Sequence, residues 1–455
     1  MDYDFFQDNQ QENQPERVPA PLQSGEGPQK KHKKTNWKKV ILSVGLAVLS
    51  FGCGLLAAWA TLDPEMRSLI TVKRRIQNDY YQEVTDEEFY NAIFGVINND
   101  LLDNYSQYMT PEEFEETISD LAGNRIGIGL SFSGNGEDAL RITRVCGNSP
   151  AEKAGIKVGE KIIGYGKTEA TLIAATDFET FSSFLSDYKA GENFLLQLEC
   201  EGAERLVSVY KAAYVENYVF YRSNQTAYAF TGEDADILTA KGEALSYLDN
   251  DTAYIQLVQF TGNAADGFDA VMAQFKKEGK KHLILDLRGN GGGYLDTMQS
   301  IASYFCKSAT KSQPVVAVAD YGDKRTMYES YGNWYYEYFT DDSRIYVLAD
   351  KYSASASECL IGSMIDYGAI TFSDICLIER GGVAKTYGKG IMQETQLIDY
   401  IRQDAITLTT AKICWPLSNR NIHDRGILPA DGAKTSKENT DREKETQEAI
   451  KTLLG

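Results

Sequence analysis

A long apolar run near its start limits how this chain can be arranged. No residue from Val40 to Leu62 carries a charge, and a helix needs roughly 20 apolar residues to cross a bilayer. Basic residues precede the run, namely Lys30, Lys31, Lys33, Lys34, Lys38 and Lys39, whereas acidic and mixed residues follow it. The positive-inside rule therefore predicts a transmembrane signal anchor at 40–62 in a single-pass cell-membrane protein, with the N-terminus cytoplasmic and the rest extracytoplasmic. A cleaved signal peptide is the alternative, although the run is long for a signal core.

Composition narrows the classes of partner. The formal net charge of −19 leaves no basic surface that could neutralise phosphates, so nucleic acid is not expected as a partner. The chain has 3 histidines, none in an HxxxH or HExxH pattern, and we expect no metal and no cofactor. Its 7 cysteines form no CxxC pair, and their spacing selects no disulfide pairing.

Pattern and composition divide the chain into segments. Residues 1–39 are polar and then basic, which predicts a disordered cytoplasmic tail. Residues 63–122 carry apolar residues at helical spacing, and Thr110 with Glu113 predicts a capping box there. Three further segments complete the division: a β-rich domain at 123–212, the largest unit at 213–434, and a charged C-terminal tail or helix at 435–455, which we expect to be exposed.

The largest unit alternates two kinds of pattern. Its apolar segments AYIQLVQF, HLILDLRG and RIYVLAD read as strands, and helical patterns separate them. Such βαβ repeats are typical of a sheet that is covered on both faces. The predicted fold class is therefore an α/β core with a largely parallel sheet, preceded by a β-rich domain, N-terminal helices and a single transmembrane helix.

Two short segments of this unit carry residues suited to nucleophilic catalysis. Ser355 is the middle serine of SASASE and precedes an apolar run that predicts a buried helix. Its Oγ would lie at a helix N-terminus, where free N–H groups and the dipole favour negative charge. Lys389 stands between two glycines, and Gln393 follows four residues later. A serine activated by a neutral lysine is a known alternative to the Ser-His-Asp triad, and burial lowers the pKa of such a lysine.

A glycine-rich turn follows one of the predicted strands. The segment LDLRGNGGGYL, from Leu285 to Leu295, predicts a buried strand that opens into glycines. A dinucleotide fingerprint counted from Gly289 fails, because Tyr294 occupies its last glycine position, and no phosphate-loop GK[ST] is present. Glycine N–H groups at a strand end can instead donate to an oxyanion. A tight turn without a chemical role is the alternative.

Three motifs of 123–212 occur in a recognisable order: GIGL, SPAEKAGI and VGEKIIG. Together they resemble a PDZ domain of the permuted type found in bacterial-style proteases. Such domains bind an extended peptide by strand addition and hold its terminal carboxylate on backbone N–H groups. The alternative is a small β-rich domain whose glycines only make turns. The resemblance implies a carboxylate-binding loop formed by Ile126, Gly127, Ile128, Gly129 and Leu130.

The largest unit carries six ordered motifs: AYIQLVQF, LDLRGNGGG, VLADKYSASASECL, TYGKGIMQE, TLTTAKICWP and RGILPAD. They resemble the carboxyl-terminal processing protease family, and with the PDZ portion the resemblance spans roughly residues 70–432. It implies that Ser355 is the nucleophile, that Lys389 is its general base, and that Gln393 orients the lysine.

The resemblance also implies an oxyanion hole made by the backbone N–H groups of Gly292 and Ala356.

The chain departs from the family pattern in three ways. The stretch between serine and lysine is longer, with extra residues around Phe372 to Ala384, and Gly291 replaces a customary proline. The segment before GKG is also unusual, which makes Lys385 a competing base that lacks the flanking glycines and the glutamine.

Other functions fit these residues less well. A Ser-His-Asp hydrolase would have to use His423 or His282, and no GxSxG elbow exists. The SxxK pattern of penicillin-interactive enzymes occurs at scattered places without SDN or KTG. The non-enzyme alternative is a catalytically silent, membrane-tethered PDZ scaffold that binds protein C-termini. A scaffold has no physical need for Ser355, Lys389 and Gln393 together.

The resemblance thus implies a membrane-anchored serine endopeptidase that cleaves extracytoplasmic proteins at or near their C-termini. Its partners would be protein or peptide substrates, which the PDZ domain recognises through their C-termini. Members of the family are often dimers through helices near their N-terminal part. Residues Met66–Leu121 are therefore a candidate homodimer interface.

Overall fold

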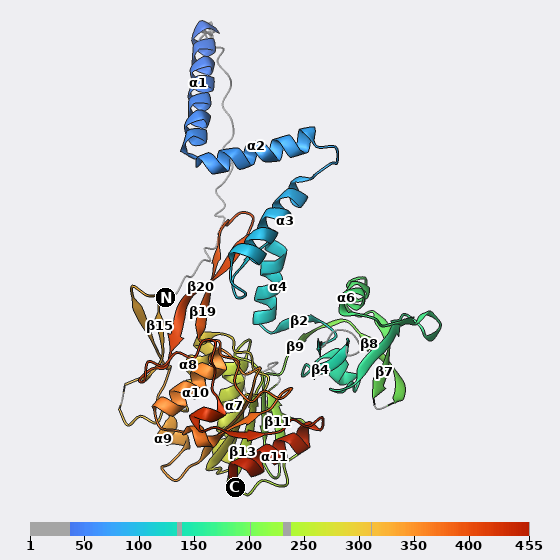
Figure 1. Cartoon of the computed structure of the whole chain (residues 1–455), viewed down its shortest axis with the longest axis vertical. Helices are drawn as coiled ribbons and strands as arrows, with labels where there is room; N and C mark the ends of the chain where they lie inside the picture. Colours follow the sequence, from blue (N-terminus) through green and yellow to red (C-terminus); the bar gives the residue numbers. More distant parts are fainter. Residues whose placement is uncertain (1–36, 134–138, 201, 231–237, 311, 455) are drawn as a thin grey trace, which may run out of the picture. The chain divides into compact units, whose positions relative to one another are not determined.

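The computed structural model describes residues 37–133, 139–200, 202–230, 238–310 and 312–454. The chain divides into two compact units, and the boundary in the sequence lies between Tyr90 and Asn91. The first unit contains α1 (Trp37–Thr61), α2 (Pro64–Asp79) and the start of α3 (Asp86–Val96) (Figure 1). Within α1, residues Ile41–Thr61 are long and apolar enough to cross a membrane, by length and composition alone. Elsewhere in the described chain no helix meets this criterion.

The second unit begins with the rest of α3, a π-helical turn (Ile97–Leu101), β1 (Gln107–Met109) and α4 (Pro111–Leu121). The predicted capping box of α4 is confirmed: the Thr110 hydroxyl accepts from the Glu113 N–H, and the Glu113 carboxylate accepts from the Thr110 N–H. This reciprocal pair satisfies two backbone donors that a helix start leaves unbonded. It fixes the point at which the chain turns from β1 into α4.

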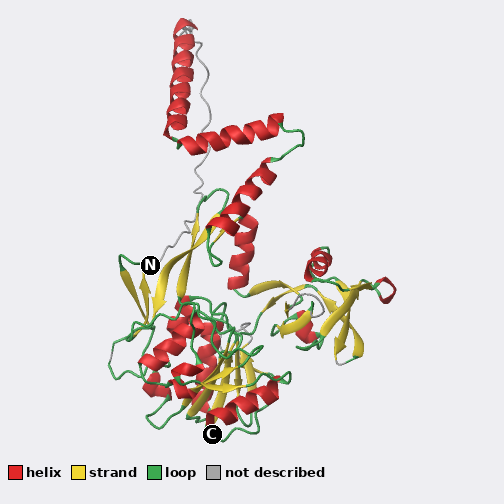
Figure 2. Ribbon diagram, viewed as in Figure 1, coloured by secondary structure: helices red, strands yellow, loops and turns green. Residues whose placement is uncertain are grey.

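The β-rich segment folds around its own core. An antiparallel sheet with the order β3-β4-β5-β7-β8 packs against α6 (Figure 2), and Phe181, Phe194 and Leu196 are buried there. Alternate residues of the Asn193–Cys200 strand face this core, as its alternating sequence predicts. The elements are β3 (Leu130–Ser133), β4 (Arg141–Val145), α5 (Pro150–Lys153), β5 (Lys161–Gly166), β6 (Ile173–Ala174), α6 (Phe178–Ser186), β7 (Asn193–Cys200) and β8 (Ala203–Tyr210). A separate antiparallel ribbon of β2 (Asn124–Gly127) and β9 (Ala212–Val215) flanks them in the sequence.

The largest unit is built on an eight-stranded sheet with the order β12-β11-β10-β13-β14-β17-β18-β21. Neighbouring strands are parallel from β13 to β21, and antiparallel from β12 to β13. The sheet is therefore mixed, and the largely parallel arrangement predicted from the sequence describes only part of it. The strands are β10 (Val219–Arg222), β11 (Ala227–Phe230), β12 (Leu238–Ala240), β13 (Thr252–Leu257), β14 (His282–Asp286), β17 (Ile345–Asp350), β18 (Ile375–Ile378) and β21 (Lys434–Ser436).

Helices cover both faces of this sheet. Because side chains alternate along a strand, Ile255 and Leu285 pack with α7 (Ala264–Lys277), α8 (Leu295–Ala302) and α10 (Ala356–Asp366). Tyr254 and Ile284, one position along, pack on the opposite face with α11 (Arg442–Leu454). A short helix, α9 (Tyr335–Tyr338), adds Tyr335 to the first of these cores. The result is a three-layered α/β core.

The C-terminal segment does not form an exposed tail, so that expectation is corrected. Its apolar residues Ala449, Ile450 and Leu453 are buried against the sheet, and Glu445 accepts hydrogen bonds from Arg288 and Arg380. The charged residues that suggested a solvated tail lie mostly on the outer side of α11. The helical alternative is the one that the fold adopts.

A second sheet was not predicted. It has the order β1-β20-β15-β16, with β19 paired to β20, and its strands are β15 (Val315–Asp320), β16 (Arg325–Glu329), β19 (Ile391–Leu397) and β20 (Ala405–Cys414). Through β1, this sheet joins the segment that precedes the β-rich domain to the C-terminal part of the largest unit. It thereby brings residues near position 105 beside residues near positions 389 and 409.

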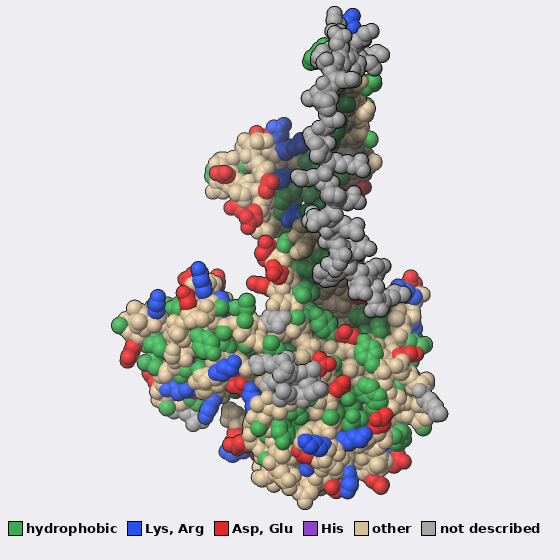
Figure 3. All heavy atoms as spheres, turned by 180° about the vertical axis from the view of Figure 1, so that it is seen from behind, with side chains coloured by type: hydrophobic (Ala, Val, Ile, Leu, Met, Phe, Trp, Pro, Cys, Tyr) green, Lys and Arg blue, Asp and Glu red, His purple; other side chains and the backbone are tan. Residues whose placement is uncertain are grey.

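Acidic and basic side chains are mixed on one face of the molecule. On the face drawn in Figure 3, basic side chains are scattered among acidic ones, and no basic patch gathers there.

Candidate active site

Ser355 occupies a strained turn at the start of α10. Its φ of 54° and ψ of −113° lie outside the regions that side-chain-bearing residues favour. Such strain persists only where the surroundings impose it, and it is common at functional sites. Gly292 approaches closely: its φ is 101°, and a Cβ added there would lie 2.8 Å from the Ser355 Cβ. Only glycine fits beside this serine.

Three chain segments converge on this turn. The backbone N–H of Ala354 donates to the Asn290 carbonyl (3.0 Å), which also accepts from the Ser357 hydroxyl (2.9 Å). The Tyr387 N–H donates to the Ser353 carbonyl (3.0 Å). The strand ends that follow β14 and β17 are thereby bonded to each other and to the segment that carries Lys389.

The carboxylate of Glu358 connects the serine and the lysine segments. One of its oxygens accepts from the Ser355 N–H (3.1 Å) and the Lys389 N–H (2.9 Å), and the other accepts from the Thr386 hydroxyl (2.5 Å) and the Gly388 N–H (2.8 Å). Burial raises the pKa of Glu358, while these donors act in the opposite direction. Glu358 therefore connects the backbone of the Ser355 turn to the backbone at Gly388 and Lys389.

Lys389 is half-buried in a setting that disfavours its charge. Desolvation lowers the pKa of its ammonium, and the negative charge of Asp103 partly opposes that shift. Among the described residues it forms no ion pair, and its Nζ lies 5.0 Å from the centroid of the Tyr105 ring. The glycine before it, Gly388, has a φ of 93° and a close backbone contact with Gly426. Lys389 thus lies on a constrained turn, and the pKa of its ammonium is lowered.

Gln393 projects from β19, four residues after the lysine. Its side-chain N–H donates to the Thr409 hydroxyl at 3.2 Å, and the Thr409 N–H donates to the Ser106 hydroxyl at 2.8 Å. In this conformation Gln393 therefore bonds to the neighbouring strand β20. Its predicted role in orienting Lys389 stays a prediction.

The two predicted oxyanion donors differ in their surroundings. Ala356 is the first residue of α10, a position whose backbone N–H has no partner within the helix. The Gly292 N–H instead donates to the side-chain oxygen of Asn290 at 2.9 Å. Asn290 is itself buried and donates to the Leu257 carbonyl. An anion at this place would have to compete with Asn290 for the Gly292 donor.

The predicted peptide-binding loop lies at the entry to the β-rich domain. Ile126 is exposed and Ile128 is buried, and the Ile128 carbonyl accepts from the Ala151 N–H at 2.8 Å. Leu130 begins β3, which lies at the edge of its sheet. An edge strand has free backbone groups with which an added strand can pair.

The competing residues take other positions. His282 lies at the start of β14, and its Nδ1 accepts from the Arg344 N–H at 3.1 Å. The His423 ring lies 6.4 Å from that of Tyr105, the tyrosine whose ring faces Lys389. The stretch from Phe372 to Ala384 includes β18, an inner strand of the large sheet.

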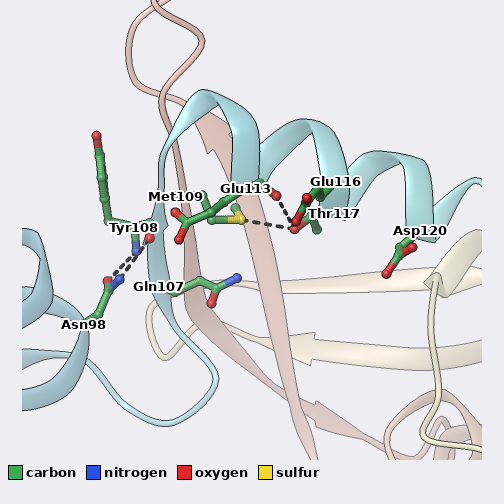
Figure 4. Close-up of a pocket in the computed structure, with 8 residues that line it drawn as sticks. All are labelled: Asn98, Gln107, Tyr108, Met109, Glu113, Glu116, Thr117 and Asp120. Carbon is green, nitrogen blue, oxygen red and sulfur yellow. Dashed lines mark hydrogen bonds between the residues drawn. The ribbon is translucent and has the colours of Figure 1, made fainter. Parts of the chain in front are cut away.

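A surface pocket of about 280 Å³ lies elsewhere, beside α4 (Figure 4). The Asn98 amide exchanges two hydrogen bonds with the Tyr108 backbone there, and the Thr117 hydroxyl contacts the Met109 sulfur. None of the predicted site residues lines it. Within the described residues, no three His, Cys, Asp or Glu side chains are grouped to hold a metal ion.

Sequence reasoning missed three residues of this site: Tyr105, Asn290 and Glu358. Glu358 had a usable signal, because a glutamate three residues after a serine at a helix start is a capping-box pattern. Asn290 stands inside the glycine turn that was singled out. Tyr105 had none, since it precedes the serine in the sequence by a whole domain.

Comparisons with known proteins find similarity to peptidases. Residues 251–431 match the model of peptidase family S41. The "Probable CtpA-like serine protease" of Staphylococcus haemolyticus is 23% identical over 436 residues, which cover 93% of this chain and 78% of that protein. The "Carboxy-terminal processing protease CtpB" of Bacillus subtilis is 26% identical over 373 residues, covering 81% and 67%. Among solved structures, "Photosystem II D1 C-terminal processing protease" aligns with a TM-score of 0.48 at 20% identity, over 83% of this chain and 94% of that one.

The family match includes the glycine turn, the strained serine and the half-buried lysine. A range of curated relatives with the same type of name accompanies it. The chain thus resembles peptidase family S41 over residues 251–431, and it is identified as a serine-type peptidase.

Proposed function

We propose that this peptidase is a membrane-anchored endopeptidase that cleaves extracytoplasmic proteins at or near their C-termini with a Ser355–Lys389 pair. The observation that carries the proposal is the junction at Glu358. One buried carboxylate oxygen accepts from the backbone of both residues, and the lysine beside it has a pKa lowered by burial. A lysine in this state can act as a base near neutral pH.

In the proposed reaction, neutral Lys389 accepts the Ser355 hydroxyl proton as Oγ attacks the scissile carbonyl. The Ala356 N–H at the helix start donates to the oxyanion, and Gly292 joins it when its N–H leaves Asn290. The ammonium then protonates the leaving amine. The acyl-enzyme is hydrolysed by water, with Lys389 again accepting a proton, and Gln393 orients the lysine throughout.

Cleavage of fluorescein-labelled casein by the full-length chain in detergent tests this assignment. Ser355→Ala and Lys389→Ala should each lower the rate by about a thousandfold or more while the thermal unfolding transition is retained. Lys385→Ala is the matched control and should cleave normally. Activity that survives in Lys389→Ala would refute the base assignment, and loss in Lys385→Ala would move that role to the competing lysine.

We further propose that the β-rich domain at 123–212 is a PDZ domain that binds substrate C-termini. Its edge strand β3 supports the proposal, because an added strand needs a free edge. The exposed Ile126 precedes that strand by four residues in the sequence. Deleting the domain should slow cleavage of a substrate with an apolar C-terminal tail more than cleavage of casein. Equal effects on both substrates would exclude a role in recognition and leave open the turn-making alternative.

The anchor and topology belong to the same proposal. Helix α1 is apolar over Ile41–Thr61, and lysines at positions 30–39 precede it, which favours a cytoplasmic N-terminus and an extracytoplasmic peptidase. The described side chains of α2 contribute none to a core. Residues Met66–Leu121 are accordingly proposed as the place where two copies meet.

A further inference from the structure

One loop outside the matched family region, Asp103–Ser106, lies over Lys389. The Tyr105 ring faces the lysine, with 5.0 Å between Nζ and the ring centroid. An ammonium within about 6 Å of a tyrosine ring is attracted by the ring face. This contact joins residues separated by the whole β-rich domain.

Hydrogen bonds hold the loop in this place. The Asp103 carboxylate accepts from the Tyr105 N–H at 3.0 Å, and the Ser106 hydroxyl accepts from the Thr409 N–H at 2.8 Å. The Tyr105 hydroxyl donates to that of Tyr387 at 3.4 Å, two residues before the lysine. The same Thr409 receives the Gln393 amide. The loop is therefore bonded to the segment that carries the proposed base, and to the residue of β20 that accepts from Gln393.

We propose that Tyr105 is a positioning residue of this peptidase, whose ring excludes water from the Lys389 Nζ and holds it in place for proton transfer from Ser355. The inference rests on the proposed function of that pair. It adds to the site a residue that reaches it from the N-terminal part of the chain.

The ring has two opposing effects on the lysine. Covering Nζ disfavours the ammonium, whereas the ring face attracts it. Burial as a whole lowers the Lys389 pKa, and the ring, 5.0 Å from Nζ, is part of that cover. The phenol itself stays neutral during an assay, because its bond to Tyr387 raises the Tyr105 pKa to about 12. The titratable groups that surround this contact are Asp103, Glu358, Tyr387, His423 and Asp424.

The test is the pH dependence of kcat/KM for casein cleavage by the full-length chain. Tyr105→Ala opens Nζ to water, so the acid limb should move to higher pH and kcat/KM at pH 7.5 should fall by about tenfold or more. Tyr105→Phe keeps the ring and should keep the wild-type profile. Tyr331→Ala, at an exposed tyrosine remote in sequence from the loop, is the control. A fall in Tyr105→Ala that is equal at every pH would overturn the proposal, because a loosened fold lowers the rate without moving the limb.

A second readout separates this inference from the proposed function. In the Ser355→Ala background, the rate at which an amine-selective reagent labels Lys389 is followed against pH by mass spectrometry. Tyr105→Ala should move that titration to higher pH, and Tyr105→Phe should not. An unmoved titration overturns the positioning role even if Lys389 is the base. A moved titration supports the contact even if Lys389→Ala proves active, in which case the proposed function alone fails.

Discussion

Two regions of the molecule hold charged side chains away from water, and they differ in whether each charge has an oppositely charged partner. In the first region, the Arg288 guanidinium nitrogens lie 2.7 Å from an Asp286 carboxylate oxygen and 2.8 Å from a Glu445 carboxylate oxygen. All three side chains are 2% exposed or less. Arg380 adds a further pair to Glu445. At the site, Lys389 is half-buried with no ion pair among the described residues. One region neutralises its charges, and the other leaves a cation without a close partner.

The pKa directions express this difference. Burial alone would raise the pKa of Asp286, but the charge of Arg288 and its hydrogen bonds hold it at about 2. Burial lowers the pKa of Lys389, and the negative charge of Asp103 raises it by a smaller amount, so the pKa of the lysine falls. A paired charge stays charged and stabilises the fold, whereas an unpaired one is ready to give up its proton. The same burial thus serves structure in one region and chemistry in the other.

The largest expected effect comes from breaking the paired region. Glu445→Ala leaves Arg288 and Arg380 short of a carboxylate inside the protein, which should cost about 3–5 kcal/mol of stability. Thermal and urea unfolding of the variant measure this loss, with the exposed Glu448→Ala on the same helix as control. A loss no larger than that of the control would mean that the network is not a unit of stability. Casein cleavage at a permissive temperature should change little.

A smaller effect is expected where a carboxylate is bonded only to neutral donors. Glu358→Gln keeps the shape but turns an amide toward backbone N–H groups, so the Ser355 and Lys389 segments should separate. We expect kcat/KM to fall by about a hundredfold, equivalent to about 2.7 kcal/mol of transition-state stabilisation. Glu337→Gln, at an exposed position, is the control. Near-normal cleavage would show that Glu358 does not align the two segments.

The two regions also differ in what the sequence reveals. The Ser355 turn and Lys389 stand in compact motifs, because local backbone geometry needs glycines and small residues at fixed spacing. The paired network joins Asp286 and Arg288 of the largest unit to Glu445 of the C-terminal segment, which is distant from them in the sequence. Such pairing follows from tertiary packing, and the acidic and basic residues near the C-terminus read instead as a solvated tail.

The same limit applies to the fold. Alternating apolar residues predicted β7, because this strand is buried on one face. Apolar segments predicted β13, β14 and β17, and the helical patterns between and after them predicted α7 and α10. The second sheet was not predicted, because two of its pairings, β1 with β20 and β15 with β20, join strands that are distant in the sequence. Tyr105 reaches the lysine only through that sheet. Residues whose role depends on a long-range pairing carry no local signal.

The smallest effect tests the unpaired region by removing its cation. Lys389→Met should stabilise the inactive protein at neutral pH, because methionine fills similar space without a desolvated charge. The sign follows from linkage: a lysine whose folded pKa is lowered binds its proton more weakly in the fold, so its cost is complete below the folded pKa and disappears above the unfolded value, about 10.4. The gain in Tm over wild type should therefore be present at pH 7 and shrink as the pH rises to 10.5. An equal difference at both pH values would mean that burial does not weaken the hold of Lys389 on its proton, and the contrast with the paired network would lose its basis.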